Sequence, residues 1–247
     1  MAVLSSVFRG IWAIYTYIII ALVVIVSSII VFCSSLIFGR KAIKFNLYLC
    51  LHISSPSILF LTGIILKTYG RENIEPKKGY VLVSNHSSYM DIFANPTSVP
   101  LHHLFTYLAK AELGKTPFFG VIARNLAVLV NRKSMESRKK SFTYMKSVLN
   151  EGISVFLYPE GTRNKTKEPL LPFFDGAFKL AKDMNVPLVV CTLVNMKKRN
   201  NINKMLDMCP GRLYCYIEEP IDVTNYTVEE LKEMTRAKML ERLAQNN

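Results

Sequence analysis

A long uncharged segment near the N-terminus most constrains how this chain can fold. From Ile11 to Phe38 roughly 28 residues pass without a charged side chain, whereas a helix needs only about 20 apolar residues to cross the hydrocarbon core of a bilayer. The segment therefore predicts one helix that spans a membrane or lies deeply embedded in it. A cleaved signal peptide is the alternative, but its apolar core would be shorter and would end at a small-residue cleavage site.

The charges around this segment predict its orientation and its surroundings. Arg9 precedes it, whereas Arg40, Lys41 and Lys44 follow it at once. Because basic residues concentrate on the cytoplasmic side of apolar helices, the rest of the chain is expected to face the cytoplasm from the inner (cytoplasmic) membrane or an equivalent one. The formal net charge of +13 calls for an anionic partner. Because the N-terminal segment is apolar, that partner is expected to be an anionic membrane and not nucleic acid.

A second apolar segment, Leu47 to Leu66, contains His52 and the serine-rich run around Pro56. The interruption argues against a simple second span and favours a helix pair that lies in, or dips into, the membrane interface. Two ordinary transmembrane helices are the alternative. At 247 residues, one globular domain behind a short membrane module fits the length. We therefore expect residues 1–66 to form a membrane anchor, the two-helix module, and residues 67–247 to form the main domain.

Strand and helix signals alternate beyond this anchor. Short β-branched runs predict strands over residues 80–84, 103–109, 126–130, 153–158, 187–194 and 212–217. Helices are expected over residues 134–150 and 175–184, and a capping box of Thr227 and Glu230 opens a final amphipathic helix. The alternation predicts an α/β fold, with a mixed sheet flanked by helices and preceded by the N-terminal membrane-associated helical module.

The motif Asn85-His86-Ser87-Ser88-Tyr89-Met90-Asp91 follows the first of these strands. Five positions apart, His86 and Asp91 would point about 140° away from each other on an ideal helix. They can meet only if His86 lies in the turn before a helix and Asp91 lies in its first turns, with Ser87 or Ser88 as the cap. Such a pair suits a general base and its orienting carboxylate. The alternative is a lone loop histidine beside an unrelated carboxylate.

Other uses of this histidine find little support. The chain has no Gly-x-Ser-x-Gly motif for a serine nucleophile, and His102 and His103 lie in a separate segment from His86. The five cysteines show no Cys-x-x-Cys spacing, so neither a metal site nor a disulfide is expected. What remains is a base that deprotonates a substrate hydroxyl for direct attack on an activated acyl group.

A second motif, Tyr158-Pro159-Glu160-Gly161-Thr162-Arg163, follows the strand predicted over residues 153–158. Gly161 lets the backbone turn closely around a ligand, and the planar guanidinium of Arg163 suits a phosphate group. A salt bridge between Glu160 and Arg163 that braces the loop is a compatible alternative. Lys110 and Arg132, each at the end of a predicted strand, are further candidate phosphate contacts, although a solvated surface charge is an equal alternative for Arg132.

Four blocks of sequence, in order, resemble the glycerolipid acyltransferase family, and most closely its 1-acylglycerol-3-phosphate acyltransferase (PlsC-like) branch. These blocks are the His86 to Asp91 motif, the segment from Gly120 to Arg132, the Glu160 to Arg163 motif with Leu171-Pro172-Phe173 and Gly176-Ala177-Phe178 after it, and Val186-Pro187-Leu188-Val189. The resemblance covers roughly residues 47–243. The chain departs from it at Asn131, where many members have aspartate, and in the long apolar segment before the matched region.

The resemblance implies a reaction and a set of roles. His86 is expected to take the proton from the sn-2 hydroxyl of lysophosphatidic acid, with Asp91 orienting it. The oxygen would attack the thioester of acyl-CoA or acyl-carrier protein and give phosphatidic acid, without a metal or an organic cofactor. The acceptor site would be formed by Glu160, Gly161, Thr162 and Arg163, with Arg163 and Lys110 on the phosphate. Glycerol 3-phosphate or another lysolipid as acceptor, a thioesterase, and a non-catalytic membrane scaffold are the alternatives.

Overall fold

A mixed seven-stranded sheet forms the centre of the computed structural model, which describes residues 2–76 and 78–245. The strand order is β1-β7-β6-β2-β5-β3-β4, and β6 and β7 are the one antiparallel pair of neighbours. The strands are β1 (Ile64–Tyr69), β2 (Val81–Ser84), β3 (Phe105–Lys110), β4 (Val128–Val130), β5 (Ser154–Leu157), β6 (Leu188–Val194) and β7 (Gly211–Ile217). The predicted mixed α/β sheet is thus confirmed.

Strands β2, β5 and β6 are buried along their whole length. Their sequences are unbroken runs of mainly β-branched and aliphatic residues, which is typical of parallel strands covered by helices on both faces. Strand β4 is shorter than predicted, because Leu126 ends a helix and the strand begins only at Val128. That helix, α5, and strand β1 were not predicted from the sequence.

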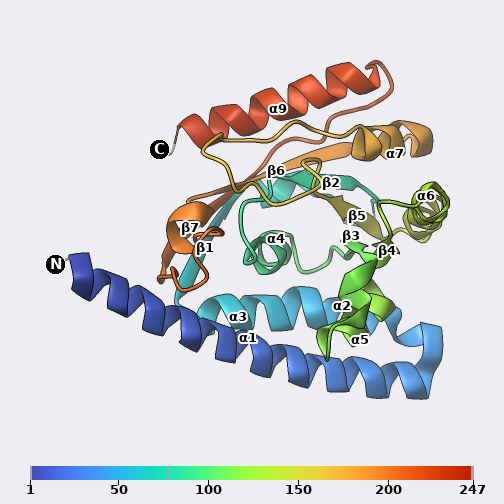
Figure 1. Cartoon of the computed structure of the whole chain (residues 1–247). Coiled ribbons are helices and arrows are strands. Elements are labelled where there is room, and N and C mark those ends of the chain that lie inside the picture. The colour runs from blue at the N-terminus through green and yellow to red at the C-terminus, as the bar shows by residue number, and fades with distance from the viewer. Residues whose placement is uncertain (1, 77, 246–247) are drawn as a thin grey trace.

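One face of the sheet is covered by α6 (Met135–Asn150), α7 (Gly176–Met184) and α9 (Val228–Ala244), which Figure 1 shows on the side away from the N-terminal helix. Helix α6 is capped by Ser134, whose side chain accepts a hydrogen bond from the Ser137 N–H. Helix α9 has the predicted capping box between Thr227 and Glu230. Because these caps satisfy N–H groups that a helix leaves open at its start, the helices begin close to where the sequence predicts.

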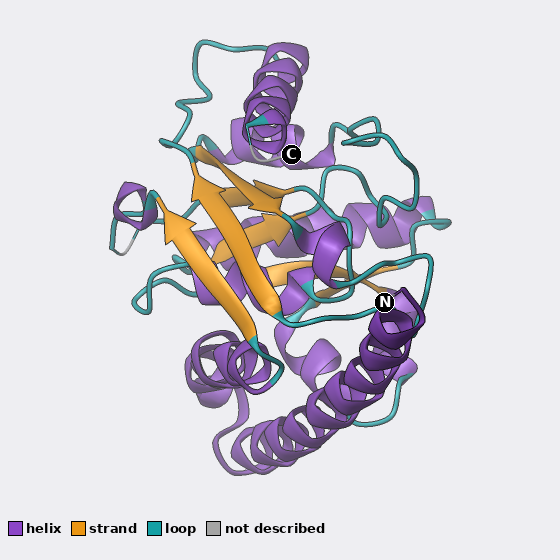
Figure 2. Ribbon diagram, turned by 90° about the vertical axis from the view of Figure 1, so that its left-hand side faces the viewer, coloured by secondary structure: helices purple, strands orange, loops and turns teal. Residues whose placement is uncertain are grey.

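The opposite face carries α4 (Asp91–Ser98), α5 (Phe119–Leu126) and the N-terminal helices, which lie along one side of the molecule in Figures 1 and 2. The N-terminal helices are α1 (Ala2–Phe38), η1 (Gly39–Ala42), α2 (Ile43–Tyr48), the π-helical η2 (Leu49–Ser54) and α3 (Ser55–Leu61). Short turns of helix elsewhere are η3 (Arg71–Asn73), η4 (Ala111–Lys115) and α8 (Met196–Arg199).

Helix α1 confirms the helix predicted over the uncharged segment and has an inverted distribution of side chains. Small and polar residues such as Ala13, Thr16 and Ser27 are buried against the rest of the protein. Large apolar residues point outward, at positions that repeat with helical spacing, including Leu4, Ile11, Ile18, Leu22 and Ile29. An outward apolar stripe of this length suits contact with lipid, since an aqueous surface would not favour it.

The second apolar segment corrects the predicted helix pair. Pro56 does not divide it, because the chain stays helical from Ile43 to Leu61 through the π-helical turns of η2. Proline fits just after these turns because π-helical spacing moves the carbonyl groups with which its ring would otherwise clash. The hydroxyls of Ser54 and Ser55 donate to the carbonyls of Leu49 and Cys50 five residues earlier.

The end of this segment belongs to the sheet. Residues 64–66, predicted as part of the membrane module, begin strand β1, which pairs in parallel with β7. Strand β1 therefore crosses the predicted boundary between residues 66 and 67, and the module is joined directly to the sheet.

Candidate active site

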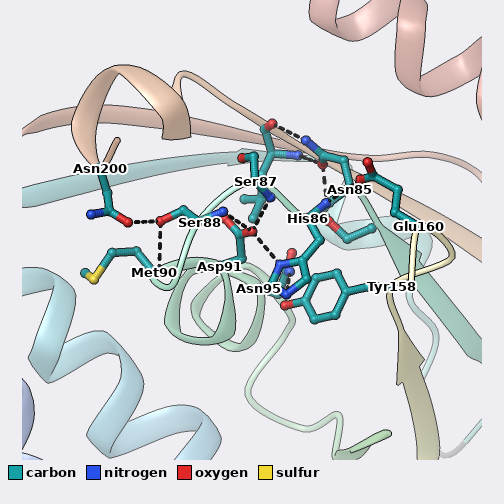
Figure 3. A network of polar contacts seen from close by, with 12 residues as sticks. Asn85, His86, Ser87, Ser88, Met90, Asp91, Asn95, Tyr158, Glu160 and Asn200 are labelled. Atoms are coloured by element: carbon teal, nitrogen blue, oxygen red, sulfur yellow. Dashed lines mark hydrogen bonds and ion pairs between the residues drawn. The ribbon is translucent and has the colours of Figure 1, made fainter. Parts of the chain in front are cut away.

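The turn between β2 and α4 brings His86 and Asp91 together. His86 precedes the helix, Asp91 is its first residue, and Nδ1 of His86 lies 2.8 Å from Oδ2 of Asp91. Figure 3 shows the carboxylate reaching back toward the imidazole across the turn. The predicted serine cap is wrong, since Met90 takes the N-cap position, and Ser88 Oγ instead accepts a hydrogen bond from the Met90 N–H.

Asp91 is fully buried, and one of its oxygens accepts three hydrogen bonds. Besides Nδ1 of His86, the backbone N–H groups of Ser87 and Ser88 donate to Oδ2 at 2.7 and 2.8 Å. Because the carboxylate accepts from Nδ1, that nitrogen carries the proton and the Nε2 lone pair of the neutral ring is free to accept one. In the described part of the chain no group is hydrogen-bonded to Nε2, so the arrangement suits a general base.

Tyr158 stacks on the imidazole of His86, with ring centroids 3.9 Å apart and planes 15° apart. The Asn95 amide of α4 donates a hydrogen bond to the Tyr158 hydroxyl at 3.1 Å. Burial, together with the nearby Asp91, raises the pKa of Tyr158, so its hydroxyl stays protonated. Sequence reasoning included Tyr158 in the second motif but assigned it no role, because the tyrosine and the histidine meet only when β2 and β5 pair.

Glu160 lies against the backbone of the first motif. Its Oε1 accepts from the His86 N–H at 2.7 Å and its Oε2 accepts from the Leu171 N–H at 2.8 Å. Burial raises the pKa of this carboxyl group, and the two backbone hydrogen bonds oppose that shift. The alternative of a Glu160–Arg163 salt bridge is wrong, since Glu160 is occupied by these backbone groups.

Arg163 instead lies over the ring of Tyr89, with its guanidinium carbon 3.8 Å from the ring centroid. The second motif thus contacts the first motif twice: the Arg163 side chain lies on Tyr89, and the Glu160 side chain binds the His86 backbone. Arg132 donates a hydrogen bond to the carbonyl of Gly161, whose φ of +65° favours glycine. Arg132 therefore contacts the turn that contains Gly161 and Arg163.

Two other residues expected at the acceptor site, Thr162 and Lys110, are exposed. Thr162 is exposed in the same turn as Gly161. Lys110 is exposed at the end of β3, with its backbone in register with Val130 of β4. Its side chain forms no hydrogen bond with the site residues in the part of the chain that the structure describes.

Two asparagines to which no role was assigned from the sequence hold the turn in place. The Asn85 side chain donates to the Leu193 carbonyl at 2.9 Å and accepts from the Leu193 N–H at 2.8 Å, which ties the turn to β6. Asn200, beyond α8, contacts the Ser88 hydroxyl. Both amides are buried, and their partners lie more than 100 residues away in the chain, so no local pattern indicates these contacts.

The histidines outside the motif lie elsewhere. His102 is exposed, and His103 is buried, with Nε2 2.7 Å from Ser154 Oγ. Within residues 2–76 and 78–245, no group of three His, Cys, Asp or Glu side chains is placed to hold a metal ion. The five cysteines are free.

Comparison with known proteins agrees with this geometry. Residues 65–194 match the family model described as Acyltransferase. The 1-acyl-sn-glycerol-3-phosphate acyltransferase of Borreliella burgdorferi is 30% identical over 202 residues, which are 78% of this chain and 76% of that protein. A putative 1-acyl-sn-glycerol-3-phosphate acyltransferase of Caenorhabditis elegans is 33% identical over 137 residues, 55% of this chain but only 51% of its own length.

The fold is also shared with a solved structure. The crystal structure of the 1-acyl-sn-glycerophosphate (LPA) acyltransferase PlsC from Thermotoga maritima is similar with a TM-score of 0.82 at 21% identity, covering 98% of this chain and 97% of that one. The family model spans more than half of the chain, and it contains both motifs of the site. The chain is therefore an enzyme of the acyltransferase family and belongs to its PlsC-like 1-acyl-sn-glycerol-3-phosphate acyltransferase branch.

Proposed function

We propose that this enzyme transfers a fatty acyl group from a thioester, acyl-CoA or acyl-carrier protein, to the sn-2 hydroxyl of 1-acylglycerol 3-phosphate. The products are phosphatidic acid and the free thiol. His86 removes the hydroxyl proton through Nε2, and the oxygen attacks the thioester carbonyl without a covalent acyl-enzyme. Asp91 fixes the tautomer and stabilises the imidazolium that forms.

The observation that carries this proposal is the pairing of His86 Nδ1 with the buried Asp91 Oδ2 at 2.8 Å. The pairing leaves Nε2 of His86 as a basic nitrogen, and no nucleophilic side chain of residues 2–76 and 78–245 is hydrogen-bonded to it. A hydroxyl brought by the substrate is therefore the group to be activated. The similar proteins are named 1-acyl-sn-glycerol-3-phosphate acyltransferases, which supports an acceptor with a free sn-2 hydroxyl.

Phosphate recognition is proposed for the turn that holds Arg132, Gly161, Thr162 and Arg163, with Lys110 as an outer contact. Arg163 keeps the edges of its guanidinium available because Tyr89 covers only its face. Glu160 supports this turn from within the protein, through its two backbone hydrogen bonds.

We also propose that the N-terminal helices, up to the end of α3 at Leu61, form the membrane module, and that the sheet from β1 onward forms the catalytic domain with its helices. Helix α1 would lie along the cytoplasmic leaflet. Helix α1 contacts the main domain both at Arg9, which pairs with Asp207, and at Ser28, which donates to the Phe118 carbonyl. These residues lie about 28 Å apart along the helix, close to the thickness of the hydrocarbon core, about 30 Å. A helix crossing the bilayer would draw the polar domain into lipid, so the contacts favour an in-plane helix.

The decisive experiment compares the wild-type protein with His86→Ala and Asp91→Asn on lysophosphatidic acid with each donor, measuring phosphatidic acid by mass spectrometry. Loss of a general base should lower kcat by at least about a hundredfold. His102→Ala, an exposed histidine outside the site, is the matched control and should keep full activity.

Other outcomes would change the proposal. Thioester consumed without phosphatidic acid would indicate hydrolysis or another acceptor, such as glycerol 3-phosphate or another lysolipid. Turnover by His86→Ala equal to that of the wild type would exclude the general-base mechanism.

A further inference from the structure

The loop between α8 and β7, residues 200–210, carries exposed apolar side chains that the active site does not use. At its tip Met205 and Leu206 are 72% and 56% exposed. The exposed Lys204 precedes them. Two neighbouring large apolar side chains beside a lysine suit an interface that is apolar on one side and anionic on the other.

This loop contacts the N-terminal half of α1, which Figure 1 shows beneath it near the N-terminus. The Tyr17 hydroxyl donates a hydrogen bond to the Met205 carbonyl at 2.9 Å, and Arg9 forms an ion pair with Asp207. The backbone of Leu206 passes against Gly10, where an added Cβ would lie 3.9 Å from the Leu206 carbonyl oxygen. These contacts therefore fix the position of the loop tip relative to helix α1.

Helical geometry gives the side of α1 on which the loop lies. Gly10 and Tyr17 are seven residues apart and share one flank of the helix. The other flank contacts the end of α3, where the Trp12 indole donates to the Thr62 carbonyl at 3.2 Å. The outward apolar stripe of α1 runs between these two flanks. Met205 and Leu206 thus widen the stripe on one side, much as Phe60, 82% exposed at the end of α3, widens it on the other.

The same loop is joined to the catalytic turn. Asn200 opens the loop, is 2% exposed, and contacts the hydroxyl of Ser88, which stands between His86 and Asp91. The loop therefore connects the outer surface beside α1 with the catalytic pair through a single buried amide.

We propose that loop 200–210 is a second membrane contact, in which Met205 and Leu206 enter the interface of an anionic bilayer beside α1. Lys204 then lies level with the lipid phosphates, and Asn200 holds the catalytic turn at a fixed distance from the surface. The proposal rests on the in-plane α1 proposed above, and goes beyond it by assigning a lipid-binding role to a segment far away in the sequence.

Tryptophan fluorescence can test the two contacts separately, because Trp12 is the one tryptophan of the chain. In the wild-type protein, Trp12 reports on α1. The double variant Trp12→Phe/Leu206→Trp carries its tryptophan in the loop. The double variant Trp12→Phe/Tyr226→Trp carries it in the turn before α9, across the sheet from α1. On vesicles of phosphatidylglycerol and phosphatidylcholine with brominated acyl chains, we expect quenching of the first two proteins and not of the third.

Each other outcome has a definite meaning. Quenching of the wild-type protein without quenching of the Leu206→Trp protein would overturn the loop contact and leave the in-plane helix standing. Quenching of neither would overturn both. Equal quenching of the Tyr226→Trp protein would also overturn the loop proposal, since it would mean that the molecule has no preferred face toward lipid.

A charge substitution provides a second test. Met205→Glu should weaken vesicle binding by about tenfold, since it places a carboxylate in the interface beside anionic lipids. Met135→Glu, at a 64% exposed methionine on α6, is the matched control and should bind vesicles like the wild type. Turnover in detergent should stay within about twofold of wild type for both variants, because neither residue touches the site. Equal binding by the two variants would overturn the proposal.

Discussion

The carboxylate of Glu160 accepts a hydrogen bond from the backbone N–H of His86, with Oε1 2.7 Å from that nitrogen. Its second oxygen accepts from Leu171 at 2.8 Å, and the residue is only 2% exposed. A single buried side chain thus joins the two sequence motifs of the site. Glu160 was expected at the acceptor, but its two oxygens are already engaged by the protein, so we propose that it acts on the reaction by positioning His86.

Substitution Glu160→Gln should therefore affect folding and turnover together. The amide oxygen can replace one carboxylate oxygen, but the amide N–H₂ group would face the other backbone N–H with no acceptor between them. We expect a loss of about 1–3 kcal/mol in the free energy of unfolding, visible as a lower Tm, and a lower kcat with little change in KM for the acceptor.

Glu168→Gln, at an exposed glutamate in the same loop, serves as its control and should behave like the wild-type protein. A Glu160→Gln enzyme with an unchanged Tm and a raised KM for the acceptor would instead support direct substrate binding by Glu160.

The parts of the site that were predictable from the sequence are the local ones. His86 and Asp91 lie five residues apart, so the requirement that they meet across the start of a helix could be worked out from helical geometry alone. Strands β2 and β6 were predicted because their continuous apolar runs match what a sheet covered on both faces requires.

The parts that were not predictable depend on contacts between distant segments. Strand β1 looks like the end of an apolar helix, and it becomes a strand because it pairs with β7, which is far along the chain. Pro56 normally indicates a helix break, but the π-helical turns before it remove that constraint. The contacts of Asn200 with Ser88 and of Tyr158 with His86 likewise exist only in the assembled fold.

His103 predicts a dependence of stability on pH. Burial, with smaller contributions from His102 and His52, lowers the pKa of His103 from 6.5 to about 4. Its Nε2 accepts from the hydroxyl of Ser154, because that oxygen already accepts from the Tyr80 N–H at 2.8 Å. The folded protein thus binds fewer protons than the unfolded chain between these pKa values. This stability is fully present above pH 6.5 and is lost as the pH falls toward 4.

The loss should reach about 2–3 kcal/mol near pH 4.5. In His103→Gln the side-chain oxygen can take the place of Nε2 as the acceptor for Ser154, but it does not titrate. Denaturant unfolding at pH 7 and pH 4.5 should therefore show a smaller acid loss for this variant than for the wild-type protein. His102→Gln, at an exposed histidine, should retain the wild-type dependence. Equal acid losses in His103→Gln and wild type would contradict the prediction.

The stacking of Arg163 on Tyr89 predicts effects on KM for the acceptor. Arg163→Lys keeps the positive charge but loses the planar fork, so KM should rise by about tenfold with little change in kcat. Tyr89→Leu removes the ring that holds the guanidinium flat, and should raise KM several-fold, whereas Tyr89→Phe should stay close to wild type because it keeps the aromatic face. Steady-state kinetics with varied lysophosphatidic acid checks this, and a fall in kcat at constant KM would exclude a binding role for the pair.

Substitutions of Tyr158 should change kcat and not KM for the acceptor, because Tyr158 contacts the proposed general base His86 and not the proposed phosphate site. Its ring covers the imidazole of His86 at 3.9 Å, while its hydroxyl contacts only structural groups such as Asn95. Tyr158→Phe keeps the ring face, so kcat should remain within about threefold of wild type. Tyr158→Leu removes the flat surface that fixes the ring plane, and kcat should fall by about tenfold or more, with KM for the acceptor unchanged.

The matched control is Tyr144→Leu, at a tyrosine that is 44% exposed on α6, where the same substitution should leave kcat unaltered. If Tyr158→Phe were as impaired as Tyr158→Leu, the hydroxyl and its bond to Asn95 would carry the effect, and positioning of His86 by ring stacking would be excluded. Recovery of kcat in the phenylalanine variant, with similar Tm values for both variants, would show that the ring surface orients the base.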